Sequence, residues 1–567
     1  MVEISKKTKV ITEVKKFIFE NNLDGYIIPK NDSYFTEYSY ENNLKKVSNF
    51  TGSAGFAIIL KKKNYLFVDG RYTLQAKKQS GKKFIILEIP YNWPKDLPNI
   101  TKSRIGFNPR LFTDHTLAKY FNKNINLIPI IYPFDKIKET KLNKMFHLNK
   151  SIVGETSLKK IKRIKNFLNL NKVNYLYVSA SENVNWLLNI RGKDLPNSPL
   201  INCKLIVSYT GKLYLFIDLK KISQNKKQFL KNVKICNENS FFEVINNLNK
   251  KNFVIDKNTC SIFEKQIIKS KFKIVSEIDP IYGLKSIKNN TELENTIKAH
   301  IEDGVAVTKF LYWFKNKDSE ITETKIEKKL EIFRKKSKNY LYPSFDTIAG
   351  SGPNGSIIHY KSNKLTNRRL GKKDILLIDS GGQYRWGTTD VTRTTCLGKV
   401  SNRIKNNFTR VLKGHIAVVN CNLNYKTNGY LVDKLARKYL NKVGLDYSHG
   451  TGHGVGFFLN VHEGPQAISK YNKVPIKKGM ILSNEPGYYL NNNYGIRIEN
   501  LIYVDELKKK LIFKNLTLAP IDTDMINFKM LNKKEKKYIF YYHLDIYAKI
   551  SKYLNNKEKK WLINLIK

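Results

Sequence analysis

Five side chains of the types that bind metal ions occur in order across the C-terminal half of this 567-residue chain. They are four carboxylates and one imidazole: Asp379, Asp390, His453, Glu485 and Glu499. A donor set made mostly of oxygen suits hard divalent cations, and two such ions close together can activate water to attack a peptide bond at neutral pH. We therefore expect the chain to fold so that these residues meet, and we expect hydrolysis as the reaction type.

The first two carboxylates lie close together in the sequence. Asp379 ends the apolar run DILLID, and a buried strand that ends in a carboxylate is costly unless the charge is paired or bound to a metal. Glycines 381, 382 and 387 predict a short turn, after which GTTDVTRTT reads as a second strand that contains Asp390. The two strands would place both carboxylates side by side. The alternative is a pair of aspartates at the edge of a turn, where Asp is common.

The histidines are unevenly distributed. Three of the nine, His449, His453 and His462, fall in the glycine-rich stretch YSHGTGHGVGFFLNVHEGP. Glycine permits a close approach of the backbone to a site, and clustered histidines with carboxylates elsewhere are typical of metal or catalytic sites. His359, in SGPNGSIIHY, follows a turn and two isoleucines, so it could equally be a hydrogen-bonded histidine of the core.

The last two carboxylates sit beside apolar strands. Glu485 follows an apolar run in ILSNEPGYY, and Glu499 is predicted in the middle of the strand YGIRIENLIYV. Arg497 lies two residues earlier, on the same face of that strand. A buried ion pair between Arg497 and Glu499 is the structural alternative to metal binding.

Composition narrows the class of protein. A chain of 567 residues is too long for one core and predicts two to four domains. No apolar run of about 18 residues predicts a membrane span, and the charged start lacks the apolar centre of a secretory signal. The five cysteines are scattered and form no CxxC motif, which fits buried thiols in a reducing compartment. We expect a cytoplasmic protein.

The net charge of +53 raises the question of a nucleic-acid partner. The excess is mostly Lys, spread along the whole chain and mixed with Asn and Ile. No basic stripe or alternation of aromatic and basic residues stands out, so the clustered footprint of a nucleic-acid-binding protein is missing. We interpret the charge as compositional and expect no nucleic-acid partner.

The order of predicted elements divides the chain into three parts. Residues 1–150 read as a mixed α/β domain with a hairpin whose tip is KKKN, and residues 151–284 repeat the order helix, strand, helix, hairpin. Residues 285–567 alternate long amphipathic helices with glycine-punctuated strands and end in a charged helical tail. Thr291 and Glu294 are a candidate capping box for the first long helix of this part.

With these residues assembled, the chain resembles the three-domain aminopeptidases P, the Xaa-Pro aminopeptidases of the pita-bread metallopeptidase fold. The resemblance spans nearly the full length. Its strongest stretches are SGPNGSIIHY, DSGGQYRWGTTDVTRT, GTGHGVGFFLNVHEGP, SNEPGYY and GIRIEN, supported by DGYIIP, VDGRYTLQA and WLLNIRGKDLPNSP near the N-terminus and LTLAPIDTDMI near the C-terminus. The resemblance implies an α/β chain with two creatinase-type N-terminal domains and a pita-bread catalytic domain with a helical extension.

The resemblance also implies roles for individual residues. Asp379, Asp390, His453, Glu485 and Glu499 would bind two metal ions, most often manganese in this family, with Asp390 and Glu499 bridging them. Glu485 would also take a proton from the attacking water. Histidines 359, 449 and 462 match residues that bind substrate and handle protons. Arg497 matches an arginine near the proline-side pocket. Phe345 and Ile358 match residues that line the pocket for the first residue of the substrate. The substrates implied are peptides with proline at the second position, and the larger members of the family imply a homodimer.

Several alternatives stay open. A prolidase, restricted to Xaa-Pro dipeptides, has the same ligands, but two leading domains favour the aminopeptidase. A methionine aminopeptidase shares the ligands on a single domain, and a creatinase-type enzyme lacks the metal. From another class, an inactive protein of the same fold could bind RNA or ribosomes through its basic surface, with salt-sensitive affinity. The intact ligand set disfavours this last alternative.

Overall fold

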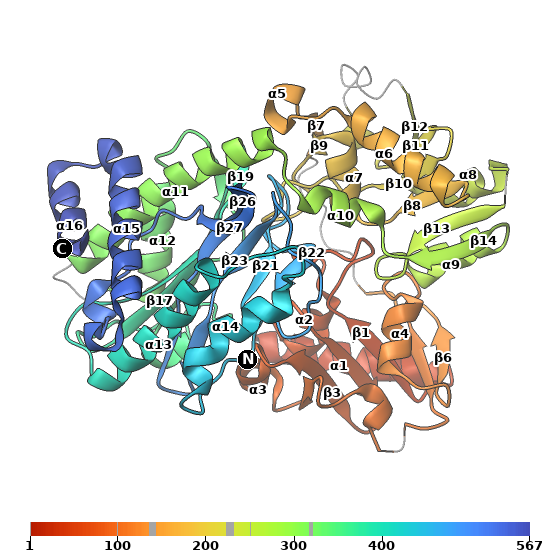
Figure 1. Cartoon of the computed structure of the whole chain (residues 1–567). Coiled ribbons are helices and arrows are strands. Elements are labelled where there is room, and N and C mark those ends of the chain that lie inside the picture. The colour runs from red at the N-terminus through yellow and green to blue at the C-terminus, as the bar shows by residue number, and fades with distance from the viewer. Residues whose placement is uncertain are drawn as a thin grey trace. The chain divides into compact units, whose positions relative to one another are not determined.

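The structure is a computed structural model that describes residues 2–98, 100–134, 143–222, 232–249, 251–316 and 321–566 (Figure 1). The chain divides into two compact units. The first consists of residues 1–150 and 155–282, and the second of residues 151–154 and 283–567. In the described part of the chain, no helix has both the length and the apolar character needed to cross a membrane.

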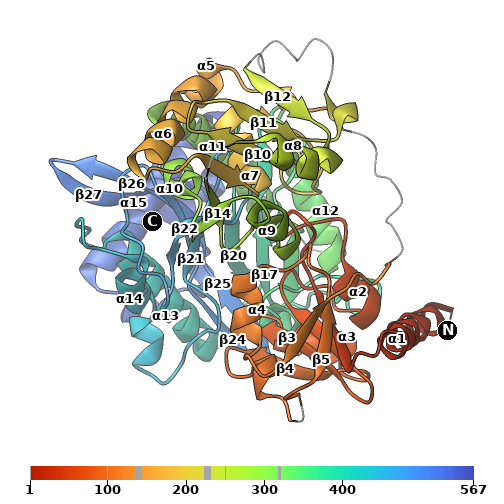
Figure 2. The same ribbon diagram turned by 90° about the vertical axis from the view of Figure 1, so that its right-hand side faces the viewer.

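The first unit contains two six-stranded sheets with the same topology (Figure 2). In the first sheet the order is β4 (Ile85–Ile89), β3 (Asn64–Asp69), β2 (Phe56–Leu60), β1 (Gly25–Pro29), β5 (Arg104–Phe107) and β6 (Asn126–Pro129). In the second it is β12 (Val233–Cys236), β11 (Leu213–Phe216), β10 (Lys204–Ser208), β8 (Tyr175–Val178), β13 (Asn252–Asp256) and β14 (Lys273–Glu277). The three central strands are antiparallel in each sheet, and the outer strands are added in parallel.

Local sequence signals account for several elements of this unit. The hairpin β2–β3 turns at the polar Lys-Lys-Lys-Asn tip, as predicted. Between β10 and β11 the chain turns at Gly211, whose φ of +92° favours glycine. The helices of this unit include α1 (Val2–Glu20), α4 (Asp114–Tyr120), α6 (Ser157–Leu170) and α7 (Ser181–Leu188), and the last two stand in the order predicted for residues 151–284.

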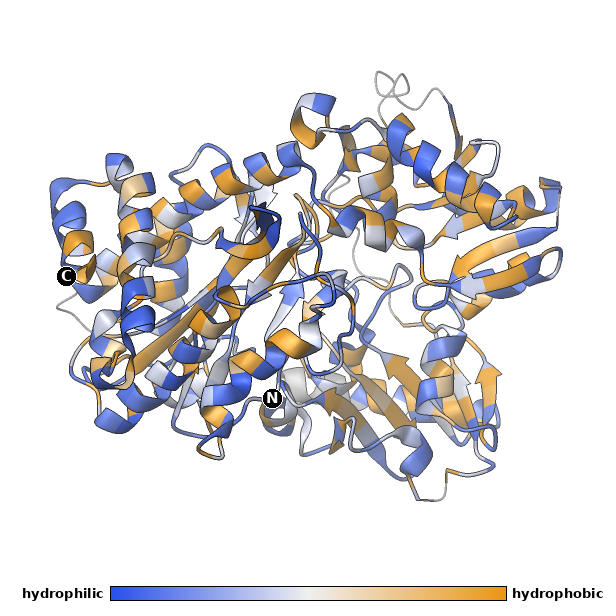
Figure 3. Cartoon of the chain, viewed as in Figure 1, coloured by the Kyte–Doolittle hydropathy of each residue, from blue (hydrophilic) through white to orange (hydrophobic). Residues whose placement is uncertain are grey.

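The second unit is a set of small antiparallel sheets with helices around them. Its sheets are β16 (Ile348–Ser351), β17 (Ile375–Ser380) and β20 (Val391–Cys396); β22 (Glu463–Ile468), β21 (Gly452–Gly454), β23 (Ile481–Asn484), β26 (Asn500–Leu507) and β27 (Lys510–Asn515); β15 (Tyr340–Pro343), β18 (Gly382–Tyr384) and β19 (Gly387–Thr388); and β24 (Gly487–Leu490) with β25 (Tyr494–Arg497). The helices are α11 (Asn290–Lys315), α12 (Glu323–Arg334), α13 (Asn402–Val419), α14 (Gly429–Asn441), α15 (Lys533–Ile550) and α16 (Asn556–Ile566). Figure 3 shows that several strands of this unit are largely apolar, whereas the surrounding helices carry both polar and apolar residues.

The start of the long helix α11 differs from the prediction. The N-cap is Asn289, whose side chain accepts a hydrogen bond from the Glu292 amide at 3.0 Å, while the Glu292 carboxylate accepts from the Asn289 amide at 3.1 Å. The capping box assigned to Thr291 and Glu294 was therefore wrong by two residues. Both pairs have the required spacing and both Asn and Thr are good N-caps, so the sequence pattern alone could not separate them.

Candidate metal centre

Asp379 and Asp390 come from neighbouring strands. β17 and β20 pair in antiparallel register, with Asp379 opposite Thr392, and Asp390 directly precedes β20. The connection is not the simple short turn that was predicted, because it forms the hairpin β18–β19, which adds to β15 in another sheet. Gly381 is needed where the connection leaves β17, since a Cβ there would lie 2.0 Å from the Thr389 carbonyl oxygen. The two carboxylates are brought side by side as expected.

His453 and Glu485 are held by one serine on a close pair of strands. A Cβ at Gly452 would lie 1.9 Å from the Ser483 carbonyl oxygen, so glycine allows β21 to approach β23. The Ser483 hydroxyl accepts from the His453 amide at 2.9 Å and donates to Glu485 Oε1 at 3.2 Å. His453 Nδ1–H donates to the Gly454 carbonyl at 2.9 Å, which leaves Nε2 as the ring nitrogen available to bind a metal ion.

The same Nε2 atom faces two carboxylates. It lies 3.5 Å from Asp390 Oδ2 and 3.5 Å from Glu485 Oε1. Single ligand atoms of Asp390, His453 and Glu499 all lie within 4.8 Å of one another. The Glu499 carboxylate accepts from the Thr392 hydroxyl at 2.8 Å, which aims it toward the strand that follows Asp390. The residues predicted to be ligands therefore converge from β17, β20, β21, β23 and the approach to β26.

Glu499 was expected in the middle of a strand, and this was wrong. It lies at the break between β25 and β26. Its backbone amide donates to Thr392 in β20 at 3.1 Å instead of continuing a ladder, so the chain changes sheets at this carboxylate. An apolar run that crosses from one sheet to another has the same sequence appearance as one continuous strand.

The electrostatics of the cluster favour bound cations. Burial, reinforced by neighbouring carboxylates, raises the pKa of both Asp390 and Glu499 well above the usual range. Asp390 and Glu499 are 4% and 1% exposed. The buried Oδ1 atoms of Asp379 and Asp390 find no hydrogen-bond partner among the described residues. Buried oxygens without donors, together with one neutral imidazole nitrogen, fit hard divalent ions.

A hydrogen-bonded chain leads away from Asp379. Arg497 Nη2 donates to Asp379 Oδ2 at 2.6 Å and Nη1 donates to the Tyr489 hydroxyl at 2.5 Å. The Tyr489 hydroxyl in turn lies 2.9 Å from His449 Nε2. The ion pair of Arg497 is thus with Asp379, and not with Glu499 as the structural alternative supposed. Tyr489 was missed by the sequence analysis, because one tyrosine in SNEPGYY carries no distinguishing signal.

Two further histidines were expected in the site. The ring centroids of His462 and His453 lie 4.4 Å apart, and the two ring planes are at 84° to each other. His359 is half-buried in the turn that follows the 3-10 helix η5 (Gly352–Ser356). The carbonyl of the preceding residue, Ile358, accepts from Arg497 Nη2 at 3.4 Å, so the backbone of this turn reaches the arginine network. The structure therefore places His462 at the cluster. It connects the turn that contains His359 to Arg497 through the carbonyl of Ile358.

Comparison with known proteins covers almost the whole chain. Residues 294–506 match the model of metallopeptidase family M24, and residues 509–567 match the C-terminal region of peptidase M24. Residues 11–137 and 136–292 each match a creatinase/prolidase N-terminal domain. A probable Xaa-Pro aminopeptidase P of Laccaria bicolor is 34% identical, over 98% of this chain and 92% of the relative. The Xaa-Pro aminopeptidase 1 of Dictyostelium discoideum is 35% identical, over 100% of this chain and 97% of the relative.

This chain belongs to metallopeptidase family M24. Within that family, a solved structure of an X-prolyl aminopeptidase from Caenorhabditis elegans, described as a cytosolic enzyme with a di-nuclear active site, matches 96% of this chain and 95% of its own. The TM-score is 0.90 at 28% sequence identity. A prolidase from Thermococcus sibiricus matches 98% of its own length but only 65% of this M24 chain, with a TM-score of 0.53 at 25% identity. The expected fold, two creatinase-type domains before an M24 catalytic domain, is confirmed.

Proposed function

We propose that this chain is an Xaa-Pro aminopeptidase, which removes the first residue from peptides whose second residue is proline. The observation that carries the proposal is the convergence of three carboxylates and one imidazole, with Asp379 on the neighbouring strand, in a chain similar over its full length to Xaa-Pro aminopeptidases. Two divalent ions, when bound, would lower the pKa of a water molecule and polarise the scissile carbonyl. Manganese is the ion we propose, because it accepts an oxygen-rich donor set.

The ligands proposed are Asp379, Asp390, His453, Glu485 and Glu499. Asp390 and Glu499 are the most deeply buried of the carboxylates and would be shared by the two ions. His453 would contribute Nε2, since Nδ1–H is committed to the Gly454 carbonyl. The hydroxyls of Ser483 and Thr392 orient Glu485 and Glu499, which is the usual work of groups that hydrogen-bond metal ligands.

The proton transfers are assigned to groups at the edge of the cluster. Glu485 Oε1 accepts from the Ser483 hydroxyl at 3.2 Å, and its side chain is 18% exposed, so water can reach it and give up a proton to it. The leaving nitrogen of a proline has no N–H and must receive a proton, for which His462 and His359 are proposed, with either also able to stabilise the oxyanion. His449 and Arg497, joined through Tyr489, would bind the substrate.

The domains proposed are residues 1–150, 151–284 and 285–567. The family matches meet near residues 137 and 292, and the division into compact units falls at residue 283. We also propose a cytoplasmic location, supported by five free cysteines and by the description of the Caenorhabditis elegans neighbour as cytosolic. A homodimer is proposed from the family resemblance, and sedimentation equilibrium would test it.

The competing assignment is a prolidase. It is not favoured, because the prolidase of Thermococcus sibiricus spans only 65% of this chain. The test is hydrolysis of an Xaa-Pro-Pro tripeptide and of an Xaa-Pro dipeptide by manganese-loaded protein, with Asp390→Ala as the control. Release of the first residue from the tripeptide by the wild type alone supports the proposal. Cleavage confined to the dipeptide overturns it.

A further inference from the structure

Arg393 is a buried cation whose charge no carboxylate neutralises directly. The residue is 2% exposed, and within the described part of the chain no Asp or Glu oxygen lies within ion-pair distance of its guanidinium. Its partners are instead neutral acceptors, mostly backbone carbonyls. A buried guanidinium is tolerated only where its N–H groups find hydrogen-bond acceptors. Because these N–H groups have a fixed planar geometry, they hold the acceptors in fixed positions relative to one another.

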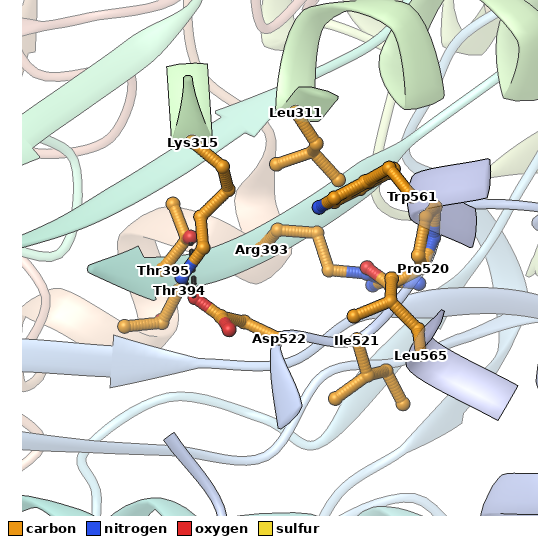
Figure 4. A pocket seen from close by; sticks show the side chains of 10 residues that line it. All are labelled: Leu311, Lys315, Arg393, Thr394, Thr395, Pro520, Ile521, Asp522, Trp561 and Leu565. Carbon is orange, nitrogen blue, oxygen red and sulfur yellow. Dashed lines mark hydrogen bonds and ion pairs between the residues drawn. The ribbon is translucent and has the colours of Figure 1, made fainter. Parts of the chain in front are cut away.

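The acceptors come from two different parts of the second unit. On the metal-centre side, Nη1 donates to the carbonyls of Thr392 at 2.7 Å and of Glu499 at 2.6 Å. On the other side, Nε donates to the Pro520 carbonyl at 3.0 Å and Nη2 donates to the Ala519 carbonyl at 2.6 Å. Figure 4 shows Arg393 reaching toward Pro520, with residues of α16 beyond it. One side chain thus ties the backbone of a proposed metal ligand to the segment that follows β27.

Tyr542 of α15 completes the connection. Arg393 Nη2 donates to its hydroxyl oxygen at 2.9 Å, and that hydroxyl lies 2.8 Å from the Ala519 carbonyl. The next residue, His543, accepts from the Ile521 amide at Nε2, 3.0 Å away, and donates from Nδ1–H to the Leu565 carbonyl of α16 at 3.0 Å. Helix α15 is therefore hydrogen-bonded to the strap of residues 517–521, which also accepts from Arg393, and α16 is hydrogen-bonded to α15.

We infer that the C-terminal segment of residues 509–567 is part of the metal centre, with Arg393 and Tyr542 as positioning residues that fix the backbone of Glu499. The inference rests on the proposed metal site, because Glu499 must be a ligand for its backbone position to matter. Because the Arg393 guanidinium binds the Glu499 carbonyl, the Ala519 carbonyl and the Tyr542 hydroxyl together, the backbone of Glu499 is coupled to the position of α15. Mutations that loosen α15 should then weaken metal binding without touching a ligand.

The test compares two tyrosines on the same helix. Tyr542→Phe removes the hydroxyl beside Arg393, while the control, Tyr538→Phe, removes one that accepts from Asn515 at 3.2 Å instead. Manganese binding to each chelator-stripped full-length protein is measured by isothermal titration calorimetry. We expect the dissociation constant of Tyr542→Phe to rise about 10- to 100-fold, the usual cost of losing a group that orients a ligand. The control should change it less than about threefold.

The outcomes separate this inference from the proposed function. If the wild type does not bind manganese, the proposed metal centre itself is wrong. If the wild type binds and Tyr542→Phe binds with an unchanged constant, the positioning role is wrong and the metal centre stands. A shift of equal size in the control also overturns the inference, because it would reflect general loosening of α15.

A second measurement uses only the wild-type protein, so it does not depend on whether a variant folds. By reciprocity, a segment that stabilises the ion-binding arrangement must itself be stabilised by the ion. Hydrogen exchange of the wild type with and without manganese should show slower exchange at residues 517–521 and 539–546, besides the direct effect around Glu485 and Glu499. Protection confined to the ligand strands, with no change in the strap or α15, overturns the inference.

Discussion

Among the buried carboxylates of the second unit, Glu463 and the pair Asp390 and Glu499 form two groups that are compensated differently. Glu463 pairs with two lysines, Lys288 Nζ at 2.5 Å and Lys285 Nζ at 3.2 Å, and all three side chains are 1% exposed. Burial alone would raise the pKa of Glu463, but the two ammonium groups outweigh it and hold that pKa below its usual value. Asp390 and Glu499 are as deeply buried, but burial and neighbouring carboxylates raise the pKa of each.

The difference distinguishes a structural carboxylate from a functional one. A buried charge must be compensated, and Glu463 is compensated by two lysines of the same chain. Among the described residues, Arg497, paired with Asp379, is the one arginine or lysine in an ion pair with the four carboxylates proposed as ligands. The compensation of these carboxylates has to come from ions in solution. The contrast with Glu463 therefore strengthens the assignment of Asp390 and Glu499 as ligands more than their burial alone would.

The largest expected effect is the loss of activity on removing a ligand charge. Asp390→Asn keeps the shape of the side chain but removes one of the charges that the ions would neutralise. We expect kcat/KM for an Xaa-Pro-Pro peptide to fall by more than about 10³-fold, equivalent to roughly 4 kcal/mol of transition-state stabilisation. Glu463→Gln, measured in parallel, should retain far more activity. Equal losses in the two variants would remove the distinction between the groups.

The second effect is on stability, where we expect Glu463→Gln, the variant that retains more activity, to be strongly affected. Glu463→Gln leaves two buried ammonium groups without a counter-charge, so we expect it to lower the free energy of unfolding by about 3 kcal/mol. A matched control is Glu506→Gln, which breaks a solvent-exposed pair with Lys478 and should cost less than about 0.5 kcal/mol. Urea unfolding monitored by circular dichroism gives both values. A cost for Glu463→Gln no larger than that of the control would show that the lysines are not needed.

The sequence predicted the ligand types better than their surroundings. Asp379, Glu485 and Glu499 each stood beside an apolar run, where an isolated charge needs an explanation, so these ligands could be proposed without coordinates. Glu463 could not be separated from them by type, because its partner Lys288 lies 175 positions earlier in the chain. Pairings at that distance depend on tertiary contacts that composition and periodicity do not encode. Arg393 and Tyr542 were missed for the same reason, since most partners of Arg393 are backbone carbonyls, which every residue has.

A smaller effect is expected from a hydroxyl that touches a ligand. Thr392→Val keeps the shape of the side chain but removes a hydroxyl that donates to Glu499 Oε2 at 2.8 Å and accepts from Arg497 Nε at 3.2 Å. We expect manganese affinity to fall about tenfold, roughly 1.4 kcal/mol. Thr395→Val, on the same strand, loses a hydroxyl that donates to Asp522 and should leave the affinity unchanged. Equal affinity in both variants would mean that the orientation of Glu499 does not depend on Thr392.

The last prediction concerns metal-free protein and contrasts the two groups by the sign of their pH dependence. The folded-state pKa of Glu463 is lowered, so its contribution to stability is present above its unperturbed pKa of 4.5 and is lost as the pH falls below that value. The folded-state pKa of Asp390 is raised above 3.8, so ionised Asp390 destabilises the metal-free fold, and this penalty disappears as the pH falls through the raised pKa. In chelator at pH 7, Asp390→Asn should be more stable than the wild type and Glu463→Gln less stable. Both differences should shrink toward zero as the pH is lowered through these ranges. Urea midpoints of the three proteins measured across that range test the contrast, and it would fail if both variants deviated from the wild type in the same direction at pH 7.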